Sequence, residues 1–301
     1  MTDKLNTEKI TGIFRVLHGY AAVMLLFVCL AAGMGGCTQT KKDTQDTQES
    51  RESREDAPAR ESKKKQTDIS TKFKDPGFLR IVREILSKSS DGAVYKTDCA
   101  GVTELTLIEK NLSSLAGIEY FTNLTLLDCR DNQLTSLPPL PKRLQTLVCH
   151  GNQIASLPSL PDVLTELDCR RNRLETLSSL PENLTVLYCE GNRLTRLPAL
   201  PAGIKALSCY ENSLERLDVS DHPELRELDC SRNKLTSLSL SGCQGLKMLV
   251  CNDNLLTALD ISDCKNLQTL DCHNNRMENK KNVIGYNKKV TTIFEFDPQI
   301  K

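Results

Sequence analysis

Apolar residues recur at fixed intervals over residues 124–277. One pattern repeats there, Leu-x-x-Leu-x-Cys-x-x-Asn-x-Leu, and its first clear copy covers residues 124–134. The second Leu and the Cys are two positions apart, so they face the same side of a strand. Each copy is therefore predicted to form one short strand followed by a polar turn. The later copies follow at nearly constant intervals, and a degenerate copy precedes the first clear one. The copies begin at Val102, Leu124, Leu144, Leu164, Leu184, Ile204, Leu225, Leu246 and Leu267.

One copy alone cannot bury its apolar groups, whereas stacked copies pack each apolar row against the same row of the next copy. The period and the pattern are similar to those of leucine-rich repeat proteins. This resemblance covers residues 102–278 and implies a leucine-rich repeat solenoid of nine repeats, with a curved parallel β-sheet on its concave face. Nine strands spaced by about 4.8 Å would give a sheet on the order of 40 Å long.

The segments that return the chain to the next strand differ between the two halves of the array. The earlier repeats have leucine- and proline-rich returns such as Leu137-Pro138-Pro139-Leu140-Pro141. Proline holds φ near the polyproline value, so these returns are predicted to be extended. The later returns, which include residues 217–220, indicate a short second strand. The convex side is therefore predicted to be mainly strand and coil.

Each clear repeat contributes one Asn and one Cys to two rows that are predicted to be structural. An Asn side chain has donors and acceptors for buried backbone groups where the chain leaves the strand. Each Cys takes the place of an inward-facing Leu and should behave as a small buried apolar residue. The Asn row comprises Asn132, Asn152, Asn172, Asn192, Asn212, Asn233, Asn254 and Asn275. The Cys row comprises Cys129, Cys149, Cys169, Cys189, Cys209, Cys230, Cys251 and Cys272.

Disulfides and metal binding are the alternatives for the Cys row. Neighbouring Cβ vectors in register would be nearly parallel and about 4.8 Å apart, whereas a disulfide needs roughly 3.5–4.5 Å. Zinc sites use close clusters such as Cys-x-x-Cys, and a single row lacks tetrahedral geometry. We therefore predict reduced thiols and no metal. Cys243 and Cys264 should stack on the convex side, and Cys99 has no evident partner.

The array is flanked by two predicted caps. Residues 72–101 show helical spacing of apolar residues, and Asp75-Pro76 supplies an N-cap followed by proline at the first helical position. Together with the residues up to 123, this helical cap resembles the N-terminal cap of internalin-like bacterial repeat proteins. Residues 279–301 are predicted to form a C-terminal cap with a final strand over residues 290–296.

Residues 1–36 have the features of an export signal. Basic residues precede a twelve-residue apolar run over residues 21–32, which is too short to span a bilayer comfortably. The sequence Met34-Gly35-Gly36-Cys37 follows. It resembles the lipoprotein box of bacterial lipoproteins, with Met34 in place of the usual Leu. The resemblance implies cleavage before Cys37 and a lipid on its thiol. An uncleaved anchor or ordinary cleavage near Ala32 are the alternatives.

Residues 37–71 are polar and highly charged, and their only large apolar residue is Ile69. Such a segment cannot bury enough surface to fold, so it is predicted to be a disordered tether. In the whole chain 39 basic residues balance 39 acidic residues, and there is no Trp. This composition argues against nucleic acid as a partner.

The outward-facing positions of the concave strands are the candidate binding surface. The middle row of these positions is predicted to be exposed, and aromatic and arginine side chains on the surface are typical anchors of protein interfaces. The middle row comprises Asp128, Val148, Asp168, Tyr188, Ser208, Asp229, Val250 and Asp271. The candidate ligand-binding residues are Arg130, His150, Arg170, Val186, Tyr188 and Tyr210.

The sequence gives little support for a catalytic function. Beyond the signal the histidines are His150, His222 and His273, no two of them in adjacent repeats. No nucleophile–base–carboxylate set or glycine-rich phosphate loop emerges, so neither a catalytic residue nor a cofactor is predicted. The returns at Leu137 and Leu197 are similar to those of bacterial effector ubiquitin ligases, which carry a separate catalytic domain after the repeats. The short segment after this array is expected to be too small for such a domain.

Two functional hypotheses follow. The first is a lipid-anchored protein of the bacterial cell envelope, at the outer membrane, whose solenoid binds a host or bacterial surface protein and can mediate adhesion. The alternative is an envelope scaffold that faces the periplasm and binds another bacterial protein. A scaffold of the effector ubiquitin-ligase type is the third and weakest interpretation. The predicted partners are a protein ligand and, through the lipid on Cys37, a membrane.

Overall fold

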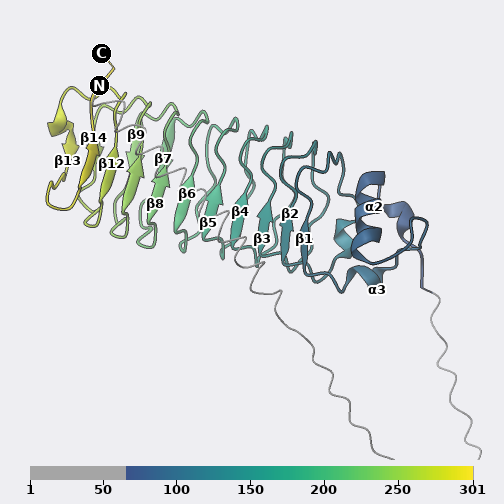
Figure 1. The fold of residues 1–301 in the computed structure, drawn as a ribbon. Coiled ribbons are helices and arrows are strands. Elements are labelled where there is room, and N and C mark those ends of the chain that lie inside the picture. The colour runs from purple at the N-terminus through teal and green to yellow at the C-terminus, as the bar shows by residue number, and fades with distance from the viewer. Residues whose placement is uncertain (1–65, 301) are drawn as a thin grey trace, which may run out of the picture. The chain divides into compact units, whose positions relative to one another are not determined.

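The protein is described by a computed structural model over residues 66–300. The predicted signal, Cys37 and most of the predicted tether lie outside the described residues. The described residues form a parallel β-solenoid, as predicted, and each turn contributes one strand to a ten-stranded sheet (Figure 1). In sheet order the strands are β1 (Glu104–Thr106), β2 (Leu126–Asp128), β3 (Thr146–Val148), β4 (Glu166–Asp168), β5 (Val186–Tyr188), β6 (Ala206–Ser208), β8 (Glu227–Asp229), β10 (Met248–Val250), β12 (Thr269–Asp271) and β14 (Ile293–Glu295).

The register of the sheet places equivalent residues of neighbouring repeats side by side. Leu127 pairs with Leu147, and Leu147 pairs with Leu167. The inward-facing Leu and Cys residues therefore form continuous rows, and both Leu127 and Cys129 are 0% exposed. Because each row packs on its own copies, the turns between β2 and β6 close through coil alone, without a layer of helices.

The return segments follow the two predicted types. Residues 137–141 and their equivalents in the next three repeats contain neither helix nor strand. The later returns form two short parallel pairs, β7 (Arg216–Asp218) with β9 (Ser237–Ser239) and β11 (Leu259–Asp260) with β13 (Val283–Ile284). After β7, the carboxylate of Asp218 accepts the Ser220 N–H at 2.9 Å, and this contact closes the turn that follows the strand.

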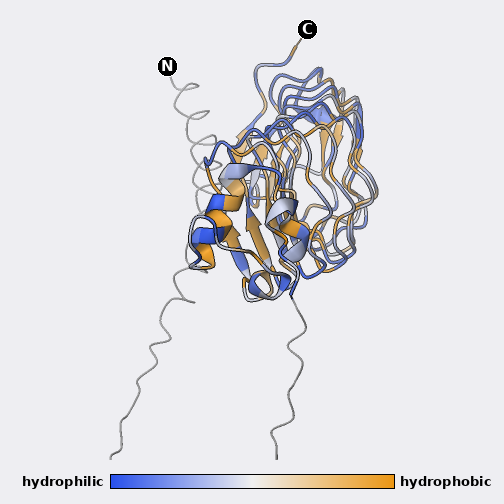
Figure 2. Cartoon of the chain, turned by 90° about the vertical axis from the view of Figure 1, so that its right-hand side faces the viewer, coloured by the Kyte–Doolittle hydropathy of each residue, from blue (hydrophilic) through white to orange (hydrophobic). Residues whose placement is uncertain are grey.

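The N-terminal end of the solenoid is covered by helix α2 (Pro76–Ile85), which Figure 2 shows from its outer side with hydrophobic and hydrophilic residues alternating around it. Its Phe78 packs against Phe73 and Phe121, with ring centroids 5.5 and 6.5 Å away. The short helices η1 (Ser70–Lys72), α3 (Lys96–Cys99) and η2 (Ile118–Tyr120) complete this end. Within residues 66–300, no helix is long and apolar enough to cross a bilayer.

Asp75 caps α2 and also ties the helix to the first repeat. One carboxylate oxygen accepts the N–H groups of Gly77 and Phe78 at 2.8 and 3.1 Å. The other accepts the N–H and the hydroxyl of Ser113 at 2.7 and 2.9 Å. Burial of Asp75 tends to raise its pKa, but the hydrogen bonds from Ser113, Phe78 and Gly77 outweigh this and lower it. The N-cap predicted from the sequence therefore also has a tertiary role.

The folded cap begins earlier than the sequence predicts. The sequence predicts that residues 66–71 belong to the tether, but Ile69 is 2% exposed and its N–H donates to the Val94 carbonyl at 2.8 Å. Asp68 forms an isolated antiparallel bridge with Tyr95. The boundary at residue 71 is therefore corrected. A composition averaged over a polar segment does not reveal that one apolar residue at its end packs on a distant part of the chain.

The C-terminal end continues the repeat geometry for one more turn, beyond η3 (Lys280–Asn282). Strand β14 lies where a final strand is predicted, and Phe296 follows it in the place of a ladder Cys. Gln299 stands three positions after Phe296, as each Asn does after its Cys. Its Nε2 donates to the Cys272 carbonyl at 3.1 Å, and its Oε1 accepts the Asn275 N–H at 3.2 Å. Gln299 thus extends the Asn row, which the sequence pattern did not reveal because both residue types differ.

Candidate functional site

We call the outward side of the ten-stranded sheet the sheet face. It consists of three rows of side chains: a middle row that includes Asp128 and Tyr188, and two flanking rows that begin at Leu126 and Arg130. The strand register places equivalent members of each row on adjacent strands. Side chains from successive repeats therefore form a single surface.

The middle row is mostly buried, so the prediction that it is exposed is wrong. Asp128 is 6% exposed and Ser208 is 2% exposed, while Tyr188 is the one half-buried member of the eight. Neighbouring strands lie only about 4.8 Å apart, so the short side chains of the middle row have close neighbours on both sides. Leu126, Glu190 and Ser231 of the flanking rows are buried as well. Direct contact with a partner is thus left mainly to Tyr188 and to the half-buried members of the flanking rows.

The buried aspartates of the middle row have a structural role. The carboxylates of Asp128, Asp168, Asp229 and Asp271 each accept the backbone N–H two positions later, at 3.2, 3.3, 3.0 and 3.3 Å. This contact satisfies a donor at the point where the chain leaves the strand. The sequence signal was an Asp immediately before the Cys in four of the repeats.

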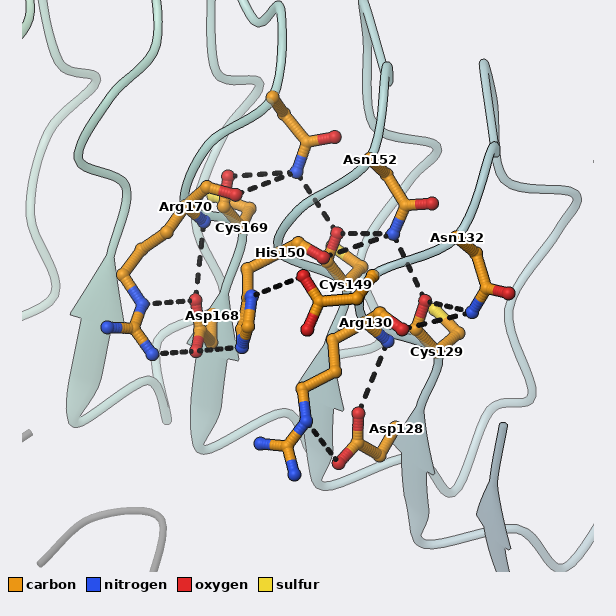
Figure 3. Close-up of polar contacts among 12 residues, drawn as sticks. Asp128, Cys129, Arg130, Asn132, Cys149, His150, Asn152, Asp168, Cys169 and Arg170 are labelled. Atoms are coloured by element: carbon orange, nitrogen blue, oxygen red, sulfur yellow. Dashed lines mark hydrogen bonds and ion pairs between the residues drawn. The ribbon is translucent and has the colours of Figure 1, made fainter. Parts of the chain in front are cut away.

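Arg130 and Arg170 follow β2 and β4 on one flanking row and are held by carboxylates (Figure 3). Arg170 donates from Nε and Nη2 to the two oxygens of Asp168 at 2.8 and 2.7 Å, and its Nη1 lies 3.3 Å from Glu190. Arg130 Nε lies 3.5 Å from Asp128. A two-point contact to a carboxylate fixes the plane of a guanidinium. Arg170 is therefore held in one orientation.

His150 lies between the two arginines and between two carboxylates, as Figure 3 shows for Asp168. Its Nδ1 is 3.8 Å from Asp131 and its Nε2 is 3.9 Å from Asp168. Burial lowers the pKa of His150 and Arg170 adds to this effect, although the carboxylates oppose it. The ring is therefore neutral near pH 7.

The aromatic and apolar part of the site comes from two neighbouring strands. Val186 and Tyr188 lie on β5, and Tyr210 follows β6. All three are half-buried. The guanidinium carbon of Arg170 lies 5.5 Å from the centre of the Tyr188 ring, a cation–π contact. Burial, assisted by the carboxylates of Glu227 and Glu190, raises the pKa of Tyr188 to about 12. Burial also raises the pKa of Tyr210. Both phenols are therefore neutral in physiological conditions.

Three of the six candidate residues, His150, Arg170 and Tyr188, are thus joined by contacts. Asp168 joins His150 to Arg170, and Arg170 contacts the Tyr188 ring. Val186 lies on the same strand as Tyr188. Tyr210 follows the next strand, while Arg130 lies at the margin, bound to its own Asp128. Sequence reasoning placed Asp168 in the middle row without a role and did not single out Glu190 or Asp131, whose ion pairs with Arg170 and His150 are made between repeats.

The Asn row runs along one edge of the sheet and joins each repeat to its neighbours (Figure 3). Asn152 is representative: its Oδ1 accepts the Leu134 N–H at 3.0 Å. Its Nδ2 donates to the carbonyls of Cys129 and Cys149 at 3.1 and 3.0 Å. The same contacts recur at the other clear repeats, so each amide links two turns.

The Cys row lies inside the solenoid, and all described cysteines are buried free thiols. Burial raises the pKa of every ladder thiol, to about 12 at Cys272. Cys243 lies on the convex side and its thiol donates to the Val219 carbonyl at 2.9 Å. Within residues 66–300, no group of three or more His, Cys, Asp or Glu residues is placed to hold a metal ion.

Comparison with known proteins bears on the fold. The family model described as Leucine Rich Repeat matches residues 224–249. A comparison with curated proteins finds no match. The solved structure of internalin C2 from Listeria monocytogenes is similar, with 21% identity, a TM-score of 0.54, and coverage of 77% of this chain and 97% of that chain. YopM, a leucine-rich effector protein from Yersinia pestis, has 29% identity and a TM-score of 0.53 over 58% of this chain and 49% of that chain.

The functional domain of InlJ from Listeria monocytogenes, which includes a cysteine ladder, has 24% identity and a TM-score of 0.49 over 77% of this chain and 61% of that chain. The chain thus spans less than two thirds of InlJ and about half of YopM. The parallel sheet, the repeat match at residues 224–249 and the likeness to internalin C2 agree on one architecture. Residues 66–300 form a leucine-rich repeat solenoid, a fold that commonly binds proteins.

Proposed function

We propose that this protein binds a protein partner through the sheet face, at Arg130, His150, Arg170, Val186, Tyr188 and Tyr210. The observation that carries the proposal is the preorganised group around Arg170, which Asp168, Glu190 and the Tyr188 ring hold in place. Aromatic and arginine side chains supply much of the binding energy at protein interfaces. Side chains that are already fixed lose little freedom on binding.

A binding role without catalysis is also supported by the chemistry of the described residues. Burial raises the pKa of the ladder thiols and thus disfavours the thiolate that a cysteine nucleophile requires. His150 lies within 4 Å of the carboxylates of Asp131 and Asp168, and the His273 ring is 2.5 Å from the Asp271 carboxylate. We therefore propose a scaffold and no enzymatic activity.

The location that we propose is the bacterial cell envelope, with the chain anchored by a lipid on Cys37. The support is the box Met34-Gly35-Gly36-Cys37 after a twelve-residue apolar run. Adhesion to a host or bacterial surface protein is the first form of this function. Binding to a periplasmic partner is the second form, and the two differ in the side of the outer membrane on which the solenoid lies.

Protease treatment of intact cells separates these two forms. If the solenoid lies outside, it should be lost from intact cells while a periplasmic control protein is retained. Protection until the outer membrane is opened would favour the periplasmic form. A Cys37→Ala variant should leave the membrane fraction, and a variant that stays there would contradict the lipid anchor.

Site-specific photocrosslinking tests the binding surface itself. Benzoylphenylalanine in place of Tyr210 should give a discrete protein adduct in cells that make the protein. The matched control is the same substitution at Val163, which is 42% exposed and lies outside the sheet face. Equal adducts at both positions, or adducts at Val163 alone, would contradict a partner on the sheet face.

A further inference from the structure

The two ends of the ten-stranded sheet differ in how the inward-facing core row is covered. At the N-terminal end, Leu105 of β1 is 1% exposed, beside the cap that carries α2 (Figure 1). At the other end the same row finishes at Phe294 of β14, which pairs with Leu270 and is half-buried. Leu127 and its equivalents in the strands between are at most 1% exposed. The core row is therefore covered at one end and partly uncovered at the other.

Strand β14 also has a backbone edge that no strand pairs with. It pairs with β12 on one side, and no strand within residues 66–300 pairs with its other side. Proteins usually protect such an edge with lysine or proline in the strand, or by covering it. Strand β14 consists of Ile293, Phe294 and Glu295, so it has neither residue. In the described part of the chain, no α-helix follows α3. The edge is therefore able to accept a further strand.

The last turn of the solenoid also carries most of the exposed apolar side chains. Five large apolar residues are exposed among the described residues, and three of them lie in this turn. Ile284, Tyr286 and Ile300 are 50, 38 and 47% exposed. The Tyr286 ring lies 4.4 Å from the Phe294 ring, measured between centroids. An apolar surface is thus continuous with the uncovered end of the core row.

The same turn is basic. Residues 279–292 include four lysines and no acidic residue. The lysines are Lys280, Lys281, Lys288 and Lys289, and all four are exposed. Lys280 Nζ lies 3.6 Å from Asp297, but both side chains are largely exposed, so this ion pair is weak. The other three make no ion pair with any side chain in 66–300. A second copy of the chain docked by the same end would bring these like charges together.

We propose that β14 receives an extended segment of a partner protein, which adds as a further strand and carries an apolar and an acidic residue two positions apart. Residues two apart on a strand face the same side. The apolar residue would pack on Phe294, and the acidic residue would lie beside Phe296. Lys280 Nζ is 5.8 Å from the centres of both rings and is therefore placed to meet the acidic group.

Backbone hydrogen bonds to β14 would supply affinity, and the two side chains would supply specificity. The surface is the edge of the sheet and lies five strands from β5, which carries Tyr188. The inference therefore does not rest on the proposed function.

Tyr286 allows a direct test. The full-length protein with ¹³C-labelled tyrosine rings would be titrated with the peptide acetyl-Ile-Thr-Glu-Thr-Ile-Thr-Glu-amide. Tyrosine-to-phenylalanine variants would assign the signals. We expect the Tyr286 signal to shift while those of Tyr188 and Tyr210 stay in place. The same peptide with lysine in place of glutamate should give no shift, and an equal shift with both peptides would overturn the proposal.

A second peptide tests whether binding occurs by strand addition. In this sheet the N–H of an outward-facing residue donates to the preceding strand, as Thr146 does to the Thr125 carbonyl at 3.0 Å. The threonines of the peptide would take this position, so a peptide that is N-methylated at its three threonines lacks the donors that would face β14. It should give no Tyr286 shift. A shift equal to that of the unmethylated peptide would refute strand addition.

The variant Lys280→Gln removes one charge at this end, so the affinity for the glutamate peptide should fall roughly 2- to 5-fold. The control is Lys234→Gln, an exposed lysine after β8, which should leave the affinity unchanged. Unchanged affinity in Lys280→Gln, or no Tyr286 shift with the glutamate peptide, would overturn the proposal. A Tyr286 signal that moves with protein concentration alone would assign the edge to a second copy and would also overturn it. The Tyr210 adduct tests the proposed function separately, so either can fail while the other stands.

Discussion

At the residue scale, the turn that follows each strand places one residue in the left-handed region. Some repeats have glycine at this position, and others have a residue with a side chain. Gly151 has φ of +64°, whereas Asp131 and Arg171 hold φ of +55° and +48°. A Cβ atom at Gly151 would lie 2.1 Å from the carboxylate of Asp131. The glycine therefore makes room for the side chain of the preceding repeat. Neither repeat considered alone shows this requirement.

Replacing Gly151 with Ala should lower the free energy of unfolding by about 1–3 kcal/mol, because the backbone would be strained and Asp131 displaced. The comparison is Gly203→Ala, where an added Cβ meets no atom within 4 Å. Its effect should stay within about 0.5 kcal/mol. Denaturant unfolding of both variants is the measurement, and equal losses would contradict the steric explanation.

The two histidines of the sheet face should respond to pH with opposite signs. The hydrogen bond that the His273 ring makes to the Asp271 carboxylate raises the pKa of His273, although burial opposes it. When folding raises a pKa, the protonated group stabilises the folded state. This stabilisation is complete below the pKa in the unfolded chain, about 6.5, and is lost as the pH rises through the pKa in the folded protein. The substitution His273→Gln should therefore cost more stability at pH 5.5 than at pH 9.

For His150, burial lowers the pKa, so the unfolded chain binds the proton more readily than the folded protein does. The contribution of His150 to the free energy of unfolding therefore falls as the pH drops below about 6.5. The cost of His150→Gln should therefore be smaller at pH 5.5 than at pH 9. Unfolding free energies of both variants at the two pH values test this. The same trend in both would show that one of the two environments is misassigned.

The substitution Cys189→Ser changes a buried apolar contact into a poorly paired hydroxyl. Cys189 is 0% exposed, and we expect a loss of roughly 1–3 kcal/mol from its burial in the row of thiols. The measurement is the denaturation midpoint of the variant against the wild-type protein. An unchanged midpoint would contradict the apolar role of the Cys row.

At the element scale, the strand-to-turn corner is built by contacts between repeats. Asn172 donates to the carbonyls of Cys149 and Cys169 at 3.0 and 3.1 Å and accepts the Ile154 N–H at 3.0 Å. The substitution Asn172→Ala would leave these buried backbone groups unsatisfied and should cost about 2–4 kcal/mol. Asn183 makes one exposed contact, to the Asp162 carbonyl, so Asn183→Ala should cost less than about 1 kcal/mol. Chemical denaturation distinguishes the two, and comparable losses would argue against the bridging role.

The strands themselves were predictable because the same local pattern recurs with a nearly constant period along the array. The candidate site was predictable only in part. Arg170 and Tyr188 could be placed on adjacent strands from their positions in the repeat. The contact of Arg170 with Glu190 could not, because it depends on side-chain directions in two different repeats.

At the scale of the whole molecule, each turn contacts mainly its two neighbours, so stability should decrease toward the ends. Cys189 lies in the middle of the sheet, whereas Cys272 lies one strand from its C-terminal edge. Both thiols are buried, and burial raises both pKa values.

Alkylation of the native protein with iodoacetamide should therefore be slow at both thiols, and Cys272 should react at least several times faster than Cys189. Site-resolved mass spectrometry at rising denaturant concentration would measure both rates in the same sample. Faster labelling of Cys189 would contradict unfolding from the end of the solenoid.

The sequence by itself determined the repeat period, the inward rows of Leu and Cys, the Asn row and the two kinds of return, because each of these is a local pattern copied along the chain. Only the tertiary structure decided that the aspartates of the middle row are buried, that Ile69 belongs to the cap and that Gln299 extends the Asn row. It also decided that Ser208 is enclosed and that its hydroxyl has no hydrogen-bond partner among the described residues. These features depend on which side chains meet across neighbouring turns, and such contacts have no fixed spacing along the chain from which they could be read.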